Sequence, residues 1–259
     1  MAGKTAVTRG AIALAAAAVL LAAPGCAATP DETQAVFART SVDVVIPSGE
    51  PFSTGLAFVA PKSDPIWTDV SQVAFVDAGG EERVLGGDVA DLVEEGSGGG
   101  DPRVGTLRLE VDGGEELAVS QVRLIIGEET ATFPVGSVTV ERADDAPAWT
   151  AVGWPGAMSS CGPVEADLDG LGDRELIEVR ADAPGLTIAN ARLDAAGGAT
   201  RLSFDMECDD AQVDFLVVTP RLVTEGDDGI REEALPPVSV GQIDIDDADV
   251  ERIRARGAD

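Results

Sequence analysis

The chain has 259 residues, with 47 Asp and Glu against 18 Lys and Arg, and a formal net charge of −29 at pH 7. It contains no His and no Tyr, which excludes histidine triads, His-ligated zinc sites and histidine acid–base catalysis. Such a charge repels phosphate backbones, so nucleic acid is excluded as a partner.

The first 26 residues read as a processing signal rather than as part of the fold. Lys4 and Arg9 give a basic start, residues 11–23 form an apolar run too short to span a bilayer, and residues 24–26 (Pro-Gly-Cys) form a small-residue cleavage point. Small residues that lead into a cysteine in this way resemble the lipobox of a bacterial lipoprotein precursor. The resemblance implies a signal peptide at 1–25 and acylation of Cys26, for example with palmitate. A plain secretory signal is the alternative.

The location of the mature chain follows from this resemblance. The chain resembles an actinobacterial envelope protein in its composition and its lipobox. It is rich in Ala, Gly and Val, and it uses Arg in place of Lys. Two acyl chains hold a protein stably on a membrane, so the implied location is the outer face of the cell membrane, lipid-anchored and extracytoplasmic. Residues 26–40 begin with polar side chains and are expected to act as a tether.

Alternation of apolar and polar residues with a period of two dominates the rest of the chain. Such alternation predicts half-buried antiparallel strands. The clearest example is 200–208, where Leu202, Phe204, Met206 and Cys208 share one face. Further sets are predicted to face inward: Leu107, Leu109 and Val111; Val122, Leu124 and Ile126; Ile177 and Val179; Val213, Phe215 and Val217.

Many short strands between Gly-rich turns indicate an all-β protein. We expect one or two antiparallel β-sandwich domains of immunoglobulin-like architecture. The best boundary leaves about a hundred residues on each side, and one larger continuous sandwich is the alternative. The predicted division is signal peptide 1–25, tether 26–40, first sandwich 41–142, linker 143–148, second sandwich with a disulfide 149–246, and short C-terminal helix or tail 247–259.

Helical patterns are scarce. A short helix is expected at 88–95 and another at 247–256, whose acidic start and arginine-rich end suit the helix dipole. The acidic cluster 244–249 is expected to end a strand and cap the last helix, so no site is assigned to it.

Two tryptophans follow the predicted linker in a segment interrupted by Gly and Pro. If exposed, Trp149 and Trp154 would form a binding anchor for a partner or ligand. If buried, they would pack one domain against the other, which is the more usual fate of large aromatic side chains.

Cys161 and Cys208 are the cysteines that remain after processing at Cys26. Outside the cytoplasm such a pair most simply forms a disulfide. A redox-active pair is disfavoured, because there is no Cys-x-x-Cys spacing and no His to lower a thiol pKa. In immunoglobulin domains the core Trp lies between the two cysteines, whereas here Trp149 and Trp154 precede both. The sequence therefore indicates sandwich architecture without indicating membership of that family.

Residues 167–178 resemble a calcium-binding loop, with acids at loop positions one, three, seven and twelve and Gly172 at six. Calcium needs six to eight converging oxygen atoms, which alternating Asp around a sharp turn can supply. Leu171 replaces the ligand at position five and a strand pattern follows, so an acidic Gly-rich turn between strands is the alternative. The candidate calcium ligands are Asp167, Asp169, Asp173 and Glu178. No other cofactor is expected.

Three functions remain open from the sequence, and it does not identify a partner. The first is a non-enzymatic, lipid-anchored interaction module of the cell envelope that binds an unknown envelope protein. The second is a small-ligand or calcium-binding extracytoplasmic lipoprotein. The third, a carboxylate-based hydrolase, is disfavoured because the sequence offers no visible nucleophile-and-base constellation.

Overall fold

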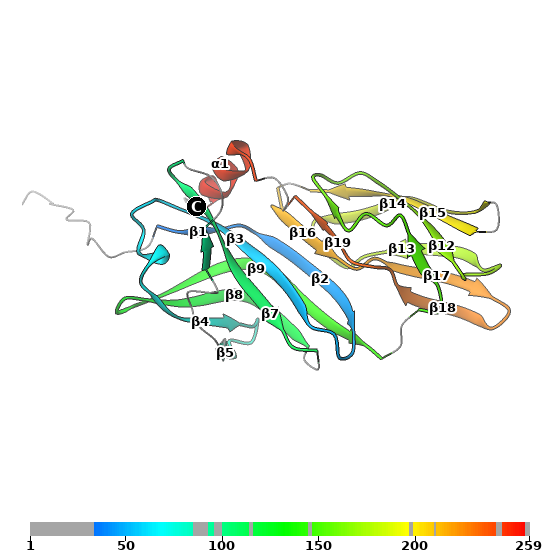
Figure 1. The fold of residues 1–259 in the computed structure, drawn as a ribbon, viewed down its shortest axis with the longest axis horizontal. Coiled ribbons are helices and arrows are strands. Elements are labelled where there is room, and N and C mark those ends of the chain that lie inside the picture. Colours follow the sequence, from blue (N-terminus) through cyan, green and yellow to red (C-terminus); the bar gives the residue numbers. More distant parts are fainter. Residues whose placement is uncertain are drawn as a thin grey trace, which may run out of the picture. The chain divides into compact units, whose positions relative to one another are not determined.

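The structure, a computed structural model, is built almost entirely from β-strands (Figure 1). It describes residues 34–84, 93–95, 100–113, 116–144, 147–196, 199–209, 211–241 and 245–256. The predicted signal peptide 1–25, Cys26 and the tether up to residue 33 lie outside these ranges. Within them, no helix is long and apolar enough to cross a membrane. The all-β prediction is confirmed, and the sheets pack face to face around apolar cores.

The first hydrophobic core lies between a four-stranded sheet and one half of a longer sheet. The large side chains of Phe58, Phe75, Leu107 and Leu124 are at most 1% exposed there, and burial of such apolar surface is the main favourable term in folding. The four-stranded sheet is antiparallel, in the order β1 (Val36–Phe37), β3 (Phe52–Ala60), β7 (Arg103–Val111) and β6 (Val93–Glu95).

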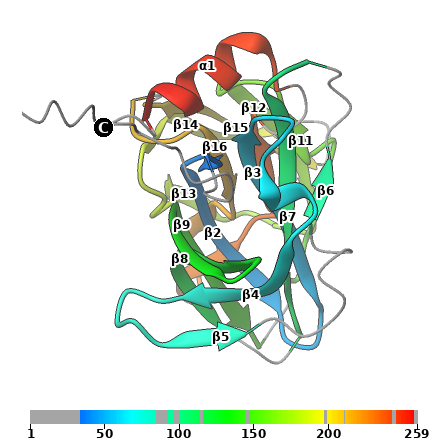
Figure 2. The same cartoon turned by 90° about the vertical axis from the view of Figure 1, so that its left-hand side faces the viewer.

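The longer sheet has eight strands and runs past both main cores. Its edge strands are β11 and β5, and β5 lies beside β4 (Figure 2). Three of its neighbouring pairs, β11 with β19, β16 with β2 and β2 with β9, are parallel, which the antiparallel prediction did not include. The order is β11 (Ala157–Met158), β19 (Val238–Val240), β16 (Phe215–Val218), β2 (Thr40–Pro47), β9 (Glu129–Ala143), β8 (Leu117–Ile126), β4 (Val70–Val76) and β5 (Glu82–Val84).

A glycine allows β9 to pass close to β2. Gly136 has a φ of 97°, and an added Cβ would lie 2.3 Å from the carbonyl oxygen of Thr40. The backbone conformation and the lack of space both exclude a larger side chain. The pairing of β8 with β9 shifts register at this point, as in a β-bulge.

The second hydrophobic core lies between two smaller sheets and the other end of the long sheet. Leu202, Phe204 and Met206 of β15 point into it and are at most 2% exposed, as their alternation predicts, whereas Cys208 is only partly buried. One sheet has the order β10 (Thr150–Val152), β12 (Pro163–Asp169), β15 (Ala199–Cys208) and β14 (Leu186–Ala196), and the other β13 (Glu175–Arg180), β17 (Arg221–Gly226) and β18 (Gly229–Ala234).

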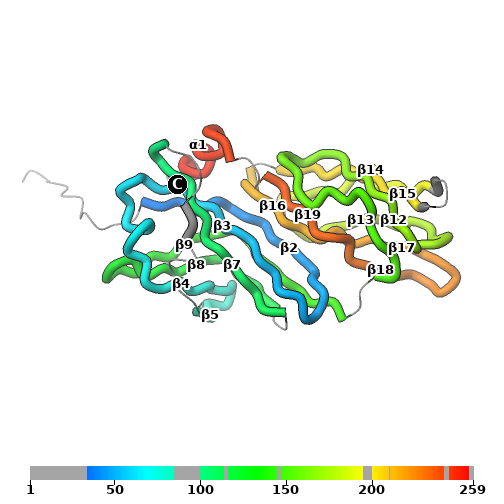
Figure 3. Tube along the Cα trace, viewed as in Figure 1, coloured from blue at the N-terminus to red at the C-terminus, as the bar shows by residue number. Residues whose placement is uncertain are grey.

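Strand β16 is buried on both faces because it lies between packed layers. It pairs in parallel with β2, although the two strands are far apart in the sequence (Figure 3). Leu216 and Val218 contribute to the second core, while Val217 contributes to the first. Phe215 packs in a third, smaller cluster with Ile253 of α1 (Asp247–Arg256). The apolar residues 215–218 therefore serve three clusters rather than one inward face.

The residues of β7 and β8 that were predicted to face inward are buried, which confirms that prediction. The same prediction is wrong for Ile177 in β13. Val179 is 6% exposed and Ile177 is 47% exposed. A register shift between Leu176 and Glu178 places one extra residue in β13 opposite β17. Such a bulge breaks the period of two, so Ile177 faces away from the core.

Two other local expectations also differ from the structure. Within the predicted helix 88–95, residues 93–95 form strand β6 and pair with β7, while 88–92 lie outside the described residues. The predicted tether 26–40 includes a folded part, because β1 pairs with β3 and Phe37 is buried in the first core.

Candidate functional site

The two tryptophans pack against the second core. Trp149 is 4% exposed. Trp154 is partly buried, its ring centroid lies 6.2 Å from that of Phe204, and its Nε1 donates a hydrogen bond to the carbonyl oxygen of Pro237 at 3.3 Å. The prediction that Trp149 and Trp154 form an exposed binding anchor is therefore wrong, because both side chains pack against the second core.

The structure does not gather the candidate calcium ligands around one point. Asp167 and Asp169 lie on β12, Asp173 follows in the turn, and Glu178 lies on β13, which belongs to a different sheet. Among the described residues, no three Asp, Glu or Cys side chains come together as a metal-binding group. Gly170 and Gly172 both have positive φ, as an acidic Gly-rich turn requires.

Asp167 already has a cationic partner. The Nε of Arg201, on the neighbouring strand, lies 2.9 Å from Oδ1 of Asp167. This hydrogen bond holds the pKa of the Asp167 carboxyl below its usual value. A calcium ion at this position would have to displace the guanidinium, so calcium binding stays a prediction with no contact in its favour.

The predicted disulfide between Cys161 and Cys208 is confirmed. Cys161 precedes β12 and Cys208 ends the adjacent strand β15. The bridge therefore joins neighbouring strands of one sheet, unlike the inter-sheet bridge of immunoglobulin domains. A disulfide is typical of proteins that fold in an oxidising compartment.

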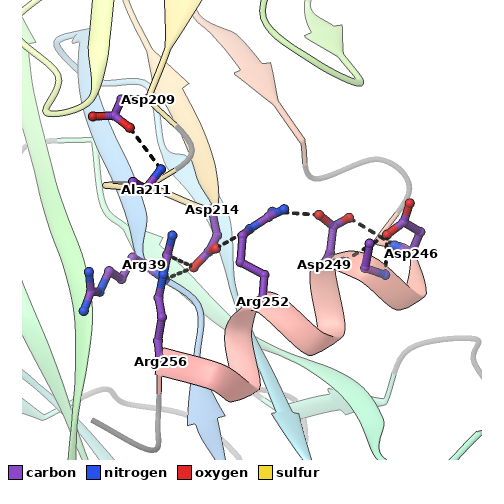
Figure 4. Close-up of polar contacts among 9 residues, drawn as sticks. Arg39, Asp209, Ala211, Asp214, Asp246, Asp249, Arg252 and Arg256 are labelled. Atoms are coloured by element: carbon purple, nitrogen blue, oxygen red, sulfur yellow. Dashed lines mark hydrogen bonds and ion pairs between the residues drawn. The ribbon is translucent and has the colours of Figure 1, made fainter.

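A buried carboxylate, Asp214, lies at the centre of a polar cluster (Figure 4). Its side chain is fully buried just before β16. Oδ2 accepts hydrogen bonds from the backbone N–H of Arg39 at 2.9 Å and from Nη1 of Arg256 at 2.6 Å, and Oδ1 accepts one from Nε of Arg252 at 2.9 Å. Asp214 thus connects a residue near the start of the fold to the last helix.

Helix α1 is capped by the acidic cluster, as the sequence predicts. Oδ1 of Asp246 accepts hydrogen bonds from the backbone N–H groups of Ala248 and Asp249, and Asp249 accepts one in return from the N–H of Asp246. This reciprocal arrangement satisfies donors that the first turn leaves free. Asp249 also accepts a hydrogen bond from Arg252 at 2.7 Å.

The Asp214 cluster holds structure together rather than offering reactive groups. Burial disfavours charge on Arg252, but its contacts with Asp214 and Asp249 raise the pKa of the guanidinium above its usual value, so it remains protonated. A pocket of about 220 Å³ lies beside the cluster, lined by Arg252, the disulfide, Ser159 and Ser160 among others. Both oxygens of Asp214 are occupied by donors, which leaves it unsuited to accept a proton from a substrate.

The sheet β13-β17-β18 exposes two large apolar side chains on one of its sides. Leu222 of β17 and Val179 of β13 face the second core, so alternate residues face away from it; we call this second side the outer face. Ile177 and Ile230 lie on the outer face and are 47% and 67% exposed. They are two of the four exposed large hydrophobic residues of the described chain; the others are Val84 and Val152.

Carboxylates surround these isoleucines. Opposite Ile230 lies Glu225, and opposite Glu225 lies Glu175. With Glu178, these acids form no ion pair among the described residues. In contrast, Glu232 is held by Arg180, at 2.7 and 2.9 Å, and lies 3.6 Å from Arg221. The outer face therefore combines exposed apolar side chains with carboxylates that form no ion pair among the described residues.

Sequence reasoning missed both the Asp214 cluster and the outer face. The residues of the cluster are separated by up to 217 positions, and no local pattern connects them. The outer face had a weak signal, because Gly226-Asp-Asp-Gly229 has the composition of a hairpin turn and is followed by a single apolar residue among charges. The unforeseen bulge in β13 hid the exposure of Ile177.

Comparison with known proteins gives structural likenesses only. No protein-family model and no curated protein matches the chain. At 11% identity it is similar to an I-band fragment of titin, with 80% of this chain and 64% of that one covered and a TM-score of 0.24. Two marsupial T cell receptor chains, also at 11% identity, have TM-scores of 0.29; the first match covers 80% of this chain and 62% of the receptor chain, the second 79% and 95%. This chain spans less than two thirds of the titin fragment and of the first receptor chain, and such TM-scores carry no argument about its function.

Proposed function

We propose that this chain is a lipid-anchored, extracytoplasmic protein of a bacterial cell envelope that acts as a non-enzymatic binding module through the outer face of the β13-β17-β18 sheet. The observation that carries the proposal is the exposure of Ile177 and Ile230 on one side of a single three-stranded sheet. Exposed apolar side chains that share a face mark a candidate interaction surface, and here carboxylates lie between and around them.

The anchor and the surface are supported separately. The lipobox-like end of the signal supports acylation at Cys26, and the disulfide supports passage through an oxidising compartment. The unpaired acids Glu175, Glu178 and Glu225 favour a partner that presents basic and apolar side chains together.

The surface is tested by crosslinking in intact membranes. A photoreactive residue replaces Glu225, between the two isoleucines, and the adducts are compared in two serine variants. Ile177→Ser with Ile230→Ser should abolish the adduct. The matched control, Val84→Ser with Val152→Ser, removes the other two exposed apolar side chains, each 53% exposed, and should leave the adduct unchanged. Equal loss in both variants would contradict the assignment of the surface.

The anchor is tested by replacing the predicted acylated residue. Cys26→Ser should release the protein from the membrane fraction or leave its signal uncleaved. An acylated, membrane-bound Cys26→Ser protein would refute Cys26 as the acylated residue without bearing on the outer face.

A further inference from the structure

Strand β18 ends its sheet, so one of its sides has no neighbouring strand in the described structure (Figure 1). It pairs with β17 through a two-residue turn flanked by Gly226 and Gly229. Antiparallel pairs alternate between residues that exchange hydrogen bonds and residues that do not. The pair beside the two-residue turn, Gly226 and Gly229, is a hydrogen-bonded pair. Every second residue of β18 after Gly229, namely Arg231 and Glu233, therefore also directs its backbone N–H and C=O toward β17.

The remaining residues of β18 direct their backbone groups to the open side. These are Ile230, Glu232 and Ala234. A hydrogen bond just beyond the strand supports this alternation, because the N–H of Leu235 donates to the carbonyl oxygen of Pro220 at 2.8 Å. The open edge therefore presents the N–H and C=O groups of three residues, spaced as a template for another antiparallel strand.

The sequence of β18 is complementary to itself in one register. If two copies pair antiparallel with Glu232 opposite its own counterpart, Ile230 lies opposite Ala234 and the three open residues meet as hydrogen-bonded pairs. The same register places Arg231 of each copy opposite Glu233 of the other. A shift of one copy by two residues also satisfies the backbone, but it places Arg231 opposite Arg231, and directly opposed like charges are unfavourable.

We propose that the partner of the β18 edge is a second copy of this chain, joined by antiparallel pairing about a two-fold axis at Glu232. The resulting sheet has six strands and brings the outer faces of both copies side by side. The contact is isologous, since the same surface is used by each copy. This inference extends the proposed function, because it doubles the surface that contains Ile177.

Two charge effects oppose this pairing, and each is countered. The two copies of Glu232 face each other, but each is already bound by Arg180. The net negative charge of the chain repels a second copy, but salt screens exposed charges beyond about 8 Å at physiological ionic strength. Confinement to a membrane also raises the effective concentration of anchored copies.

The pairing is tested by exchanging charges at two positions. Arg231→Glu gives Glu at both 231 and 233, and Glu233→Arg gives Arg at both, so each variant repels itself. Each should associate at least about tenfold more weakly than the wild type, since two attractive pairs become two repulsive pairs. An equimolar mixture of the two variants, and the double exchange Arg231→Glu with Glu233→Arg, should both recover association.

This design controls for damage within one chain. Arg231 also forms an ion pair with Asp228 of its own turn, and the double exchange still lacks that pair. Recovery in the double exchange therefore cannot come from the turn. Energy transfer between donor- and acceptor-labelled acylated chains that begin at Cys26, in neutral lipid vesicles, measures association on the membrane. Sedimentation of the chain from Ala27 onward measures it in solution.

The outcomes separate this inference from the proposed function. Loss in each single variant with recovery in the mixture supports self-pairing. Association of the wild type no stronger than that of Arg231→Glu, or a mixture no stronger than its components, overturns it. If Cys26 is not acylated, the anchor fails while sedimentation still tests the edge. If self-pairing fails while the Glu225 crosslink persists, the outer face stands without a second copy.

Discussion

Removal of the Asp214 carboxylate should destabilise the fold and release the C-terminal helix. Asp214→Ala takes away the acceptor of three hydrogen bonds, from Arg39, Arg252 and Arg256. It leaves two guanidinium groups facing each other and one backbone N–H without its acceptor. Asp214→Asn is the second variant, because it keeps the shape of the side chain while removing the charge.

The magnitude follows from the burial of the partners. Breaking a buried ion pair by removing one partner costs about 3–5 kcal/mol. The side chains of Arg252 and Arg256 are 34% and 16% exposed, so water can partly hydrate them after the change. We therefore expect the lower end, a loss of about 3 kcal/mol in the free energy of unfolding. For a domain of this size the thermal midpoint should fall by roughly 6–12 °C.

The assay combines global and local measurements on the chain from Ala27 onward. Urea unfolding followed by circular dichroism gives the global loss. Hydrogen exchange of the α1 amides gives the local one, because an isolated helix of ten residues is marginal in water. Asp228→Ala is the matched control: this carboxylate also binds two arginines, but its side chain is 44% exposed, so its loss should cost much less stability than the loss of Asp214.

One result would refute this reasoning. If Asp214→Ala loses no more stability than Asp228→Ala, and the amides of α1 keep their protection, then the cluster does not hold the helix. Packing of Ile253 in the third cluster would then be sufficient to fix α1.

Two further predictions concern packing and pH. Gly105→Ala should cost roughly 1–3 kcal/mol or more, because its Cβ would lie 2.3 Å from Phe58 and 2.7 Å from Trp67; Gly156→Ala, with nothing within 4 Å, is the control, and equal urea midpoints for the two variants would contradict the predicted clash. Burial raises the pKa of the Asp43 carboxyl above its ordinary value of 3.8, so the folded chain binds the carboxyl proton more tightly than the unfolded chain does. The folded chain therefore loses stability as pH rises from 3.8 through the raised pKa. Asp43→Asn should therefore gain thermal stability relative to the wild type between pH 3 and pH 7, and a relative loss over that range would disprove the sign.

Much of the strand content could be predicted from the sequence, because alternation is a local property. The sets in β7 and β8, and Leu202, Phe204 and Met206 of β15, are buried as their spacing predicts. The prediction failed at Ile177, where a bulge inserts one residue and reverses the facing of those before it. Nothing in the local pattern distinguishes a regular strand from a bulged one.

The candidate surfaces were less predictable than the strands. Trp149 and Trp154 were candidate binding residues because they are large aromatics, yet both pack against the second core. Exposure of Ile230 depends on β18 being the last strand of its sheet, and strand order is a long-range property. The charges of Arg231 and Glu233 become complementary only once the direction of the backbone groups of β18 is known.

The sequence by itself determined the composition-level properties of this protein. These are an acidic chain without histidine chemistry, a cysteine pair suited to a disulfide, strands of period two and a capped C-terminal helix, whereas the lipobox-like signal stays a prediction. Each depends on residue identity or on neighbours a few positions apart, where side-chain chemistry and backbone periodicity act directly.

Only the tertiary structure decided which segments meet. It placed β16 against β2, so that one short strand serves three apolar clusters. It also enclosed Asp214 between Arg39 and the arginines of α1. The pairing of β16 with β2 and the contact of Asp214 with Arg39 join residues 175 positions apart, and those of Asp214 with Arg252 and Arg256 join residues 38 and 42 positions apart. The free energy of all of them depends on burial and geometry that exist only after the sheets have packed.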